Sequence, residues 1–457
     1  NFWVTEPGQP EARVNPSVQT GMWRYYGATT LSNAPASGIT TTSAVLNATL
    51  MAADEVYDVQ VYWGTNNGGS TVGAWANNAL IGSWTNMAWT NFTYDISNLN
   101  PDTVYYCTFR ASNALTNRWA DKVISFRTDF LPSSYPYRMK ITFNGYDKDE
   151  TLTNFPALVR FGEDLVGFQY GLIQPGGTDL RFSDSTQTMN LNHEIEGWNS
   201  NGSSYVWVRV PEFTNNCSIW AFWGSGNTNV SDYISSATWD TNFLGVWHMK
   251  EPNVIDSTSL KNIGTSLGNV DALGKIGGAQ RFNDNYARID NTAAFALSNS
   301  IAVSAWVLVE GGWRTDWQAF VAKNGEGAGW TLRRHSNQNG GSMTLRGTVA
   351  NDDDPPGTAN IGDGQWHHMY GLYSGTIKCL YVDGRMDFNV PDSGPMSTDF
   401  RNVLIGSEVD GNTFRHRGLI DEVRIESYPH SSNWIWACYM NQSSIDSFYS
   451  YLPTFGI

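Results

Sequence analysis

The feature that most constrains this chain is a succession of short segments in which apolar and polar residues alternate, each followed by residues typical of turns. Residues 56–64 (VYDVQVYWG), 103–113 (TVYYCTFRASN) and 123–128 (VISFRT) are examples. A period of two places successive side chains on opposite faces, so each segment predicts a β-strand. Aromatic residues make up 14% of the chain and charged residues only 16%, which suits β-sandwiches and argues against helical bundles. The sequence therefore predicts an all-β protein.

The chain has 457 residues, more than one ordinary hydrophobic core accommodates, so we expect two to four domains. The strand segments group into three tandem β-sandwiches that follow an N-terminal stretch. The expected boundaries are an extended arm or the end of a preceding domain at 1–32, and sandwiches at 33–129, 130–242 and 243–457. The chain begins at Asn1 without an initiator Met, which indicates a processed mature form or a fragment of something longer.

Charge and cysteine content exclude several kinds of partner. The formal net charge is −15, so nucleic acid is a poor candidate, because phosphate binding needs a basic face. No apolar stretch is long enough to span a bilayer. The four cysteines are far apart and form no CxxC pair, which argues against a zinc site and against a dense disulfide framework. Cys379 and Cys438 are either a disulfide pair or buried free thiols.

The first predicted sandwich has a specific pattern at residues 98–113 (NLNPDTVYYCTFRASN). This stretch resembles the fibronectin type III pattern, in which Leu99, Pro101, Thr103 and Tyr105 form a tyrosine corner ahead of a central strand. Domains of that family are usually spacers, so the resemblance implies no binding site here.

The second predicted sandwich is characterised by four segments in a fixed order: TLTNFPALVRF (151–161), DLRFSD (179–184), HEIEGWN (193–199) and YVWVRVP (205–211). This set resembles an uncharacterised β-sandwich domain that precedes jelly rolls in bacterial and archaeal surface proteins. The resemblance implies a fold but no activity.

The third predicted sandwich carries the strongest family pattern. Its segments are DSTSLKNIG (256–264), IAVSAWVLV (301–309), QWHHMYGLYSGTIKCLYVDG (365–384), and VLIGSE followed by FRHRGLIDEVRI (403–425). They resemble, in order, the strands and turns of laminin-G-like domains, which implies a concanavalin A-like jelly roll. In the tail at 430–451, apolar residues with helical spacing follow Ser431 and Ser432, which predicts a short C-terminal helix.

A jelly roll of this kind can be a glycosidase, which needs paired carboxylates on one strand. The nearest candidate is the closing strand at 421–426 (DEVRIE). Alternation places Glu422, Arg424 and Glu426 on one face and Asp421 on the other. An arginine stands where a middle acid would be expected, so we interpret this segment as structural.

The segment HEIE at 193–196 lacks the spacing of a helical zinc protease. Glu194 and Glu196 share one face of a predicted strand, and we interpret them as a polar strand face. His367 and His368 follow each other in a strand, so their rings point to opposite faces and cannot chelate one metal side by side.

Calcium is the metal that the family resemblance favours. Laminin-G-like domains often bind one Ca²⁺ through an acid in an early turn and an acid near the closing strand, which here implies Asp256 and Asp421. The alternative for Asp256, an ordinary turn residue, stays open.

Carbohydrate binding uses exposed aromatic rings with polar neighbours. The loop 311–318 (GGWRTDWQ) and the hairpin 333–341 (RRHSNQNGG) offer both. The candidate ligand residues are Trp313, Arg314, Asp316, His335, Asn337 and Gln338.

We therefore expect a secreted or cell-surface, non-catalytic protein that binds polysaccharides or glycoprotein glycans in adhesion. One alternative is a structural subunit of a surface layer, sheath or filament, which assembles with copies of itself through Phe2, Trp3 and Val4 in the N-terminal arm. A second alternative is a polysaccharide hydrolase or lyase. Six Asn-x-Ser/Thr sequons permit surface glycosylation, at Asn47, Asn91, Asn201, Asn216, Asn229 and Asn441.

Overall fold

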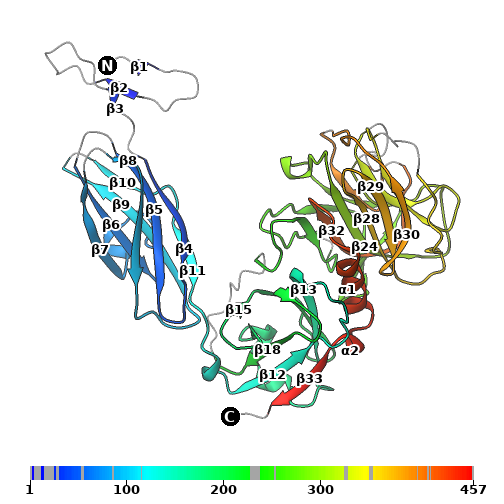
Figure 1. Ribbon diagram of the computed structural model, residues 1–457, viewed down its shortest axis with the longest axis horizontal. Coiled ribbons are helices and arrows are strands. Elements are labelled where there is room, and N and C mark those ends of the chain that lie inside the picture. Colours follow the sequence, from blue (N-terminus) through cyan, green and yellow to red (C-terminus); the bar gives the residue numbers. More distant parts are fainter. Residues whose placement is uncertain are drawn as a thin grey trace. The chain divides into compact units, whose positions relative to one another are not determined.

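The computed structural model describes most of the chain (Figure 1). The described residues are 3–4, 12–14, 25–26, 30–52, 56–84, 87–114, 116–226, 237–251, 254–323, 328–348, 354–398, 400–408, 411 and 413–454. The chain forms two compact units, Asn1–Ser134 and Tyr135–Ile457. The first contains one β-sandwich and the second contains two, so the all-β fold class with three sandwiches is confirmed. The boundaries expected at 129/130 and 242/243 stay predictions.

The sandwich of the first unit has two antiparallel sheets. One contains β4 (Thr30–Ser37), β5 (Ala44–Ala52) and β8 (Met87–Ile96), in that order. The other has the order β10 (Asn117–Trp119), β9 (Val104–Ser112), β6 (Tyr57–Gly64) and β7 (Asn77–Trp84), and β11 (Ile124–Arg127) also pairs with β9. Alternate residues of these strands fill the core, as the period of two predicts.

The hydroxyl of Tyr105 accepts a hydrogen bond from the backbone N–H of Asn100 at 3.0 Å. This is the contact expected of a tyrosine corner. The resemblance to fibronectin type III domains itself stays a prediction. The first unit also contains a small sheet of β1 (Trp3–Val4), β2 (Ala12–Val14) and β3 (Tyr25–Tyr26). Phe2 and the side chains of Trp3 and Val4 lie outside the description, so the assembly role predicted for them stays a prediction.

The first sandwich of the second unit is built from distant parts of the chain. Its five-stranded sheet has the order β15 (Asn190–Leu191), β14 (Arg181–Asp184), β18 (Ser218–Trp223), β12 (Tyr137–Thr142) and β33 (Ser450–Thr454). Its three-stranded sheet has the order β13 (Leu152–Phe161), β17 (Ser204–Phe213) and β16 (His193–Gly197). Figure 1 shows the red C-terminal strand β33 beside the cyan β12.

The second sandwich of this unit is the jelly roll. Its larger sheet has the order β21 (Val270–Leu273), β22 (Gly278–Asn283), β32 (Arg417–Glu426), β24 (Ile301–Val309), β28 (His367–Tyr373), β29 (Ile377–Val382) and β30 (Arg385–Pro391), and β19 (Phe243–Trp247) also pairs with β32. Its smaller sheet has the order β20 (Gly264–Leu267), β23 (Tyr286–Ile289), β31 (Val403–Ile405), β25 (Ala319–Lys323), β26 (Trp330–Arg334) and β27 (Gly341–Leu345). The inner faces of both sheets form one apolar core.

The predicted C-terminal helix is confirmed as α1 (Ser432–Ser443), and α2 (Ile445–Phe448) follows it. The side chain of Ser431 caps α1 by accepting the N–H of Trp434. Trp434 packs into the core of the preceding sandwich, while Gln442 accepts the indole N–H of Trp306 in the jelly roll at 2.6 Å. The helix therefore joins the two sandwiches of the second unit. Short 3₁₀ turns occur at Val72–Ala74, Pro132–Ser134, Tyr170–Leu172, Pro175–Gly177 and Ala293–Phe295.

All four cysteines are free thiols: Cys107, Cys217, Cys379 and Cys438. Of the two readings of Cys379 and Cys438, the structure therefore supports free thiols, and both side chains are buried.

Candidate functional site

The two segments chosen as a ligand site from the sequence lie against each other at one end of the smaller jelly-roll sheet. The loop 311–318 connects β24 to β25, and the hairpin 333–341 contains the turn between β26 and β27. We call these two segments the loop rim. Arg334 joins them: its guanidinium donates to the carbonyls of Thr315 at 2.9 Å and of Asn337 at 2.7 Å. Both segments are thereby fixed relative to each other.

Two indoles stand at this contact, each beside a buried arginine. The Arg334 guanidinium lies 4.4 Å from the ring centroid of Trp313, and Arg333 lies 4.2 Å from that of Trp317. The ring of His335 meets Trp317 edge-on at 4.8 Å. Both tryptophans are half-buried, so part of each indole faces solvent. Trp317 thus belongs to the rim rather than to the core.

Polar side chains surround these indoles. Arg314, Asp316, Asn337 and Gln338 are exposed, and Arg314 forms an ion pair with Asp284. The rim therefore combines apolar area with donors and acceptors. The six residues predicted from sequence lie in this one region, and their role in ligand binding stays a prediction.

The buried side-chain amide of Gln318 holds the loop 311–318 of the rim in place. Gln318 Oε1 accepts the N–H of Arg314 at 3.1 Å, and Gln318 Nε2 lies 3.1 Å from Nδ1 of His416. Gln318 and His416 are both fully buried. The position of the loop therefore depends on a hydrogen-bond chain that reaches into the jelly roll.

Two cavities of about 520 Å³ each also open on the second unit, and none of the six rim residues lines either one. One is lined by Thr358, Asp383, Arg385, Asp387 and Tyr439 among others, next to the hairpin of β29 and β30. The other lies beside Asn216 in the preceding sandwich. They are alternative places for a small ligand and supply controls for tests of the rim.

The two predicted calcium ligands, Asp256 and Asp421, accept hydrogen bonds from other residues of the protein. Asp256 is fully buried, and its carboxylate accepts four hydrogen bonds: from the N–H groups of Val246, Thr258 and Asn262 and from the hydroxyl of Thr258. These bonds occupy about four lone-pair positions, the full acceptor capacity of a carboxylate. A calcium ion at Asp256 would have to displace them, so Asp256 fits the turn role better than that of a calcium ligand. Asp421 accepts one N–H, from Ile276 at 2.9 Å.

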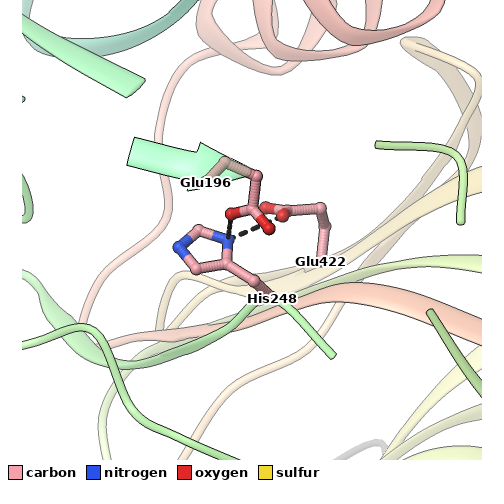
Figure 2. A group of neighbouring side chains, drawn as sticks. All are labelled: Glu196, His248 and Glu422. Atoms are coloured by element: carbon pink, nitrogen blue, oxygen red, sulfur yellow. Dashed lines mark hydrogen bonds and ion pairs between the residues drawn. The ribbon is translucent and has the colours of Figure 1, made fainter. Parts of the chain in front are cut away.

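A second cluster, which the sequence did not predict, lies inside the second unit between its two sandwiches. Glu194 and Glu196 come from β16, and His248 follows the end of β19. Glu422 lies in β32, and Figure 2 shows it together with Glu196 and His248. Along one edge of β32, β22 pairs up to Ile420 and β19 pairs from Val423 onward. The cluster forms where the partner strand changes. We call these four side chains the junction cluster.

The distances in the junction cluster are short. Nδ1 of His248 lies 2.6 Å from Oε2 of Glu196 and 2.6 Å from Oε1 of Glu422, and Figure 2 shows both carboxylates directed at this edge of the ring. Its other nitrogen, Nε2, lies 3.4 Å from Oε2 of Glu194. Arg424 binds the second oxygen of Glu422 at 2.8 Å.

Burial and charge oppose each other at His248. Burial disfavours the charged ring, but the surrounding carboxylates, above all Glu196 and Glu422, outweigh it and hold the pKa of His248 well above its ordinary value. Burial raises the pKa of Glu196. For Glu422 the charges of His248 and Arg424 outweigh burial, so its pKa is lowered. The side chains of His248, Glu196 and Glu422 are 3%, 0% and 1% exposed, which leaves no access for a polysaccharide.

The polar strand face that carries Glu194 and Glu196 is not open to solvent at Glu196, which is buried against His248 of the jelly roll. A β-bulge also interrupts the alternation predicted for the closing strand, since Ser304 pairs with Arg424 but Trp306 with Asp421. Glu422 at this bulge has a φ of +49°. An alternating strand pattern shows neither which domain will cover a strand face nor where a bulge will interrupt the strand. No sequence pattern singled out His248.

The sequons differ in accessibility. Asn91, Asn201 and Asn216 are exposed and Asn47 is half-buried, whereas Asn229 lies outside the description. Asn441 is 1% exposed, and its amide bonds both the N–H and the carbonyl of Leu158. Surface glycosylation at Asn441 is therefore incompatible with the folded chain.

Comparison with known families matches two parts of the second unit. A model of the concanavalin A-like lectin/glucanases superfamily matches residues 281–435, and a model of a domain of unknown function matches residues 176–238. The C-terminal laminin-G-like prediction is thereby supported. No curated protein matches the chain.

Three solved structures that match the chain each cover less than half of it. Domain 4 of AbnA, an extracellular arabinanase from Geobacillus stearothermophilus solved with arabinotriose, is 20% identical with a TM-score of 0.36, over 43% of this chain and 97% of that one. The binding domain of Paraclostridial Mosquitocidal Protein 1 is 11% identical with a TM-score of 0.37, over 43% of this chain and 52% of that one. The binding domain of botulinum neurotoxin serotype G is 11% identical with a TM-score of 0.36, over 44% and 52%. Among the described helices, none has the length and apolar character needed to cross a membrane.

Proposed function

We propose that the chain is an extracellular, non-catalytic protein that binds glycans through the loop rim of its jelly roll, in adhesion to polysaccharides or glycoproteins. The observation that carries this proposal is the pair of half-buried indoles, Trp313 and Trp317, held together with exposed polar side chains. Sugars present C–H faces that pack on aromatic rings and hydroxyls that bond to amides, carboxylates and guanidinium groups.

The preorganisation of the rim supports the same proposal. Arg334 already bonds the carbonyls of both segments, and Gln318 bonds the backbone of the loop. A ligand would therefore not have to order these segments, which reduces the entropic cost of binding.

The test begins with an array of plant, bacterial and animal glycans, including arabinotriose, probed with the full chain with and without Ca²⁺. For a glycan that binds, Trp313→Ala and the double variant Asn337→Ala/Gln338→Ala should each weaken binding about tenfold, or ~1.4 kcal/mol. Isothermal titration calorimetry measures the change.

Two matched variants separate the rim from other surfaces. Trp89→Ala removes a tryptophan that is 64% exposed in the first unit, and Arg385→Ala alters one of the two cavities. Both should leave the affinity unchanged. Binding that is lost with Arg385→Ala and kept with Trp313→Ala would move the site to that cavity, and no binding to any glycan in either buffer would contradict the proposal.

The comparison of the two buffers also tests calcium at Asp256 and Asp421, which stays a prediction. Assembly through the N-terminal arm stays a prediction as well, and no described contact favours it. The junction cluster does not favour a hydrolase, because its carboxylates are buried.

A further inference from the structure

Nδ1 of His248 faces two carboxylate oxygens at equal distance. Oε2 of Glu196 and Oε1 of Glu422 each lie 2.6 Å from it (Figure 2). A ring nitrogen carries either one proton or one lone pair, so it can satisfy only one of two anions with a well-directed hydrogen bond. A single cation between the three atoms would satisfy all of them at once.

Carboxylates outnumber cationic side chains around this point. Arg424, Lys250 and Lys275 lie near four carboxylates, those of Glu194, Glu196, Asp421 and Glu422. Unpaired buried charge is costly. A metal cation beside Nδ1 of His248 would therefore lie in an acidic environment.

The geometry needs little change to hold a metal ion. The three donor atoms lie within 4.8 Å of one another and come from three separate elements. Around a tetrahedral ion with metal bonds of about 2.0–2.2 Å, neighbouring donor atoms lie about 3.3–3.6 Å apart, so the 2.6 Å contacts would have to open by about 0.7–1 Å.

The surroundings resemble those of a metal-bound histidine. A ligating imidazole usually directs its other nitrogen at a carboxylate, which fixes the ring. Here Nε2 of His248 lies 3.4 Å from Glu194, and Glu194 is itself held by the indole N–H of Trp239 at 2.7 Å and by the hydroxyl of Ser257 at 2.6 Å.

An independent sign of a missing ligand is the second oxygen of Glu196. This carboxylate is 0% exposed, yet its Oε1 has no hydrogen-bond partner among the described residues and only a 4.0 Å contact with Lys250. Buried polar atoms without a partner are rare in folded proteins.

From these observations we propose that Glu196, His248 and Glu422 bind one divalent transition-metal cation, with Zn²⁺ the best fit, between the two sandwiches of the second unit. One imidazole and two carboxylates suit zinc and its neighbours better than calcium, which prefers an all-oxygen site. Because the site is buried, the metal has a structural role and ties β16 to the jelly roll.

The experiment uses the full chain without a histidine tag. Inductively coupled plasma mass spectrometry should find about one equivalent of a divalent metal per chain, either as purified or after refolding with Zn²⁺. Thermal unfolding in excess EDTA should occur at a lower temperature, and refolding with Zn²⁺ should restore it. Refolding with Co²⁺ should give visible d–d absorption typical of nitrogen and oxygen ligands.

The variants Glu196→Gln and His248→Asn should lose the metal and the effect of EDTA. The matched control is His367→Asn, which alters another histidine that lies between two carboxylates, Asp363 and Asp383, outside the junction. The control variant should keep both the metal and the effect of EDTA on the unfolding temperature. If a variant fails to fold, the measurements on the unaltered chain still decide. No metal after refolding with Zn²⁺ or Co²⁺, an unfolding temperature unaffected by EDTA, or full metal content in folded Glu196→Gln would each overturn the proposal.

Discussion

At the scale of single residues, the tautomer of His416 determines how the loop rim is supported. The Gln318 amide nitrogen only donates, so Nδ1 of His416 must accept, and the ring is neutral with its proton on Nε2. The opposite orientation of Gln318 is excluded because its oxygen accepts the N–H of Arg314. Burial lowers the pKa of His416 to about 4, which keeps the ring neutral near pH 7.

This depressed pKa predicts a loss of stability in mild acid. As the pH falls below about 6.5, the unfolded chain protonates at this histidine, whereas the folded chain does so only near pH 4. The free energy of unfolding should therefore fall through this window, by about 3 kcal/mol from His416, and level off below it. Urea unfolding at about pH 7, 5.5 and 4.5 measures the slope, which should be smaller in His416→Gln.

The control for this prediction is His367→Gln. The hydrogen bonds to Asp383 and Asp363 outweigh partial burial and raise the pKa of His367, so its contribution is lost on raising the pH rather than on lowering it. This variant should keep the acid slope. Equal slopes in His416→Gln and the unaltered chain would show that His416 is not the group responsible.

At the scale of elements, the sequence predicted the strands and the helix better than it predicted which of these elements pack against one another. The segments HEIE and DEVRIE were both recognised as strands, and they are β16 and β32. Their convergence on His248 depends on how one sandwich docks on the next and on the bulge at Glu422. An alternating pattern specifies which face of a strand is buried but does not identify the element that covers it. The grouping of the rim residues was predictable because they lie on two loops of one jelly roll, and their role in ligand binding stays a prediction.

The edge strand β13 shows a second long-range arrangement. Asn441 of α1 accepts the N–H of Leu158 at 2.6 Å and donates to its carbonyl at 2.9 Å, as a neighbouring strand would. Two residues further along, the hydroxyl of Tyr449 accepts the N–H of Arg160, and the hydroxyl of Tyr451 donates to its carbonyl. Side chains of the C-terminal segment thus satisfy an edge that would otherwise be open.

This arrangement predicts a large effect for a small substitution. Asn441→Ala should lower the free energy of unfolding by roughly 2–4 kcal/mol, because it leaves a buried N–H and a buried carbonyl without partners. Asn433→Ala on the same helix removes one partly buried hydrogen bond, to Glu150, and should cost about 1 kcal/mol. Chemical denaturation of both variants makes the comparison, and equal losses would contradict this role of Asn441.

At the scale of the whole molecule, the second unit is completed by its last strand. β33 pairs with β12 from Arg138–Thr454 to Thr142–Ser450, so the sandwich whose other strands lie between residues 137 and 223 includes a strand from beyond the jelly roll. The core of that sandwich also contains Trp434, Ala437 and Phe448. The tandem order of the sequence patterns gave no indication that the C-terminal strand pairs with β12.

We therefore predict that a fragment of residues 130–242 will not fold alone. Without residues 430–454 it lacks an edge strand, part of its core and the partners of β13. Adding a peptide of residues 430–454, or fusing it ahead of residue 130 through a flexible linker, should increase dispersion in the NMR spectrum and protection from proteolysis. A cooperative unfolding transition in the isolated fragment would refute the prediction.

The pairing of β33 with β12 also determines when this sandwich can be completed during biosynthesis. About 300 residues separate β12 from its partner strand. At about 5–20 residues per second, translation of this stretch takes roughly 15–60 s, far longer than a β-hairpin needs to form. During that interval the edges of β12 and β13 are exposed while the jelly roll is still being made. The nascent chain is therefore most prone to misassociation at the strands β12 and β13. This exposure ends only when the C-terminal segment has been made and can cover both edges.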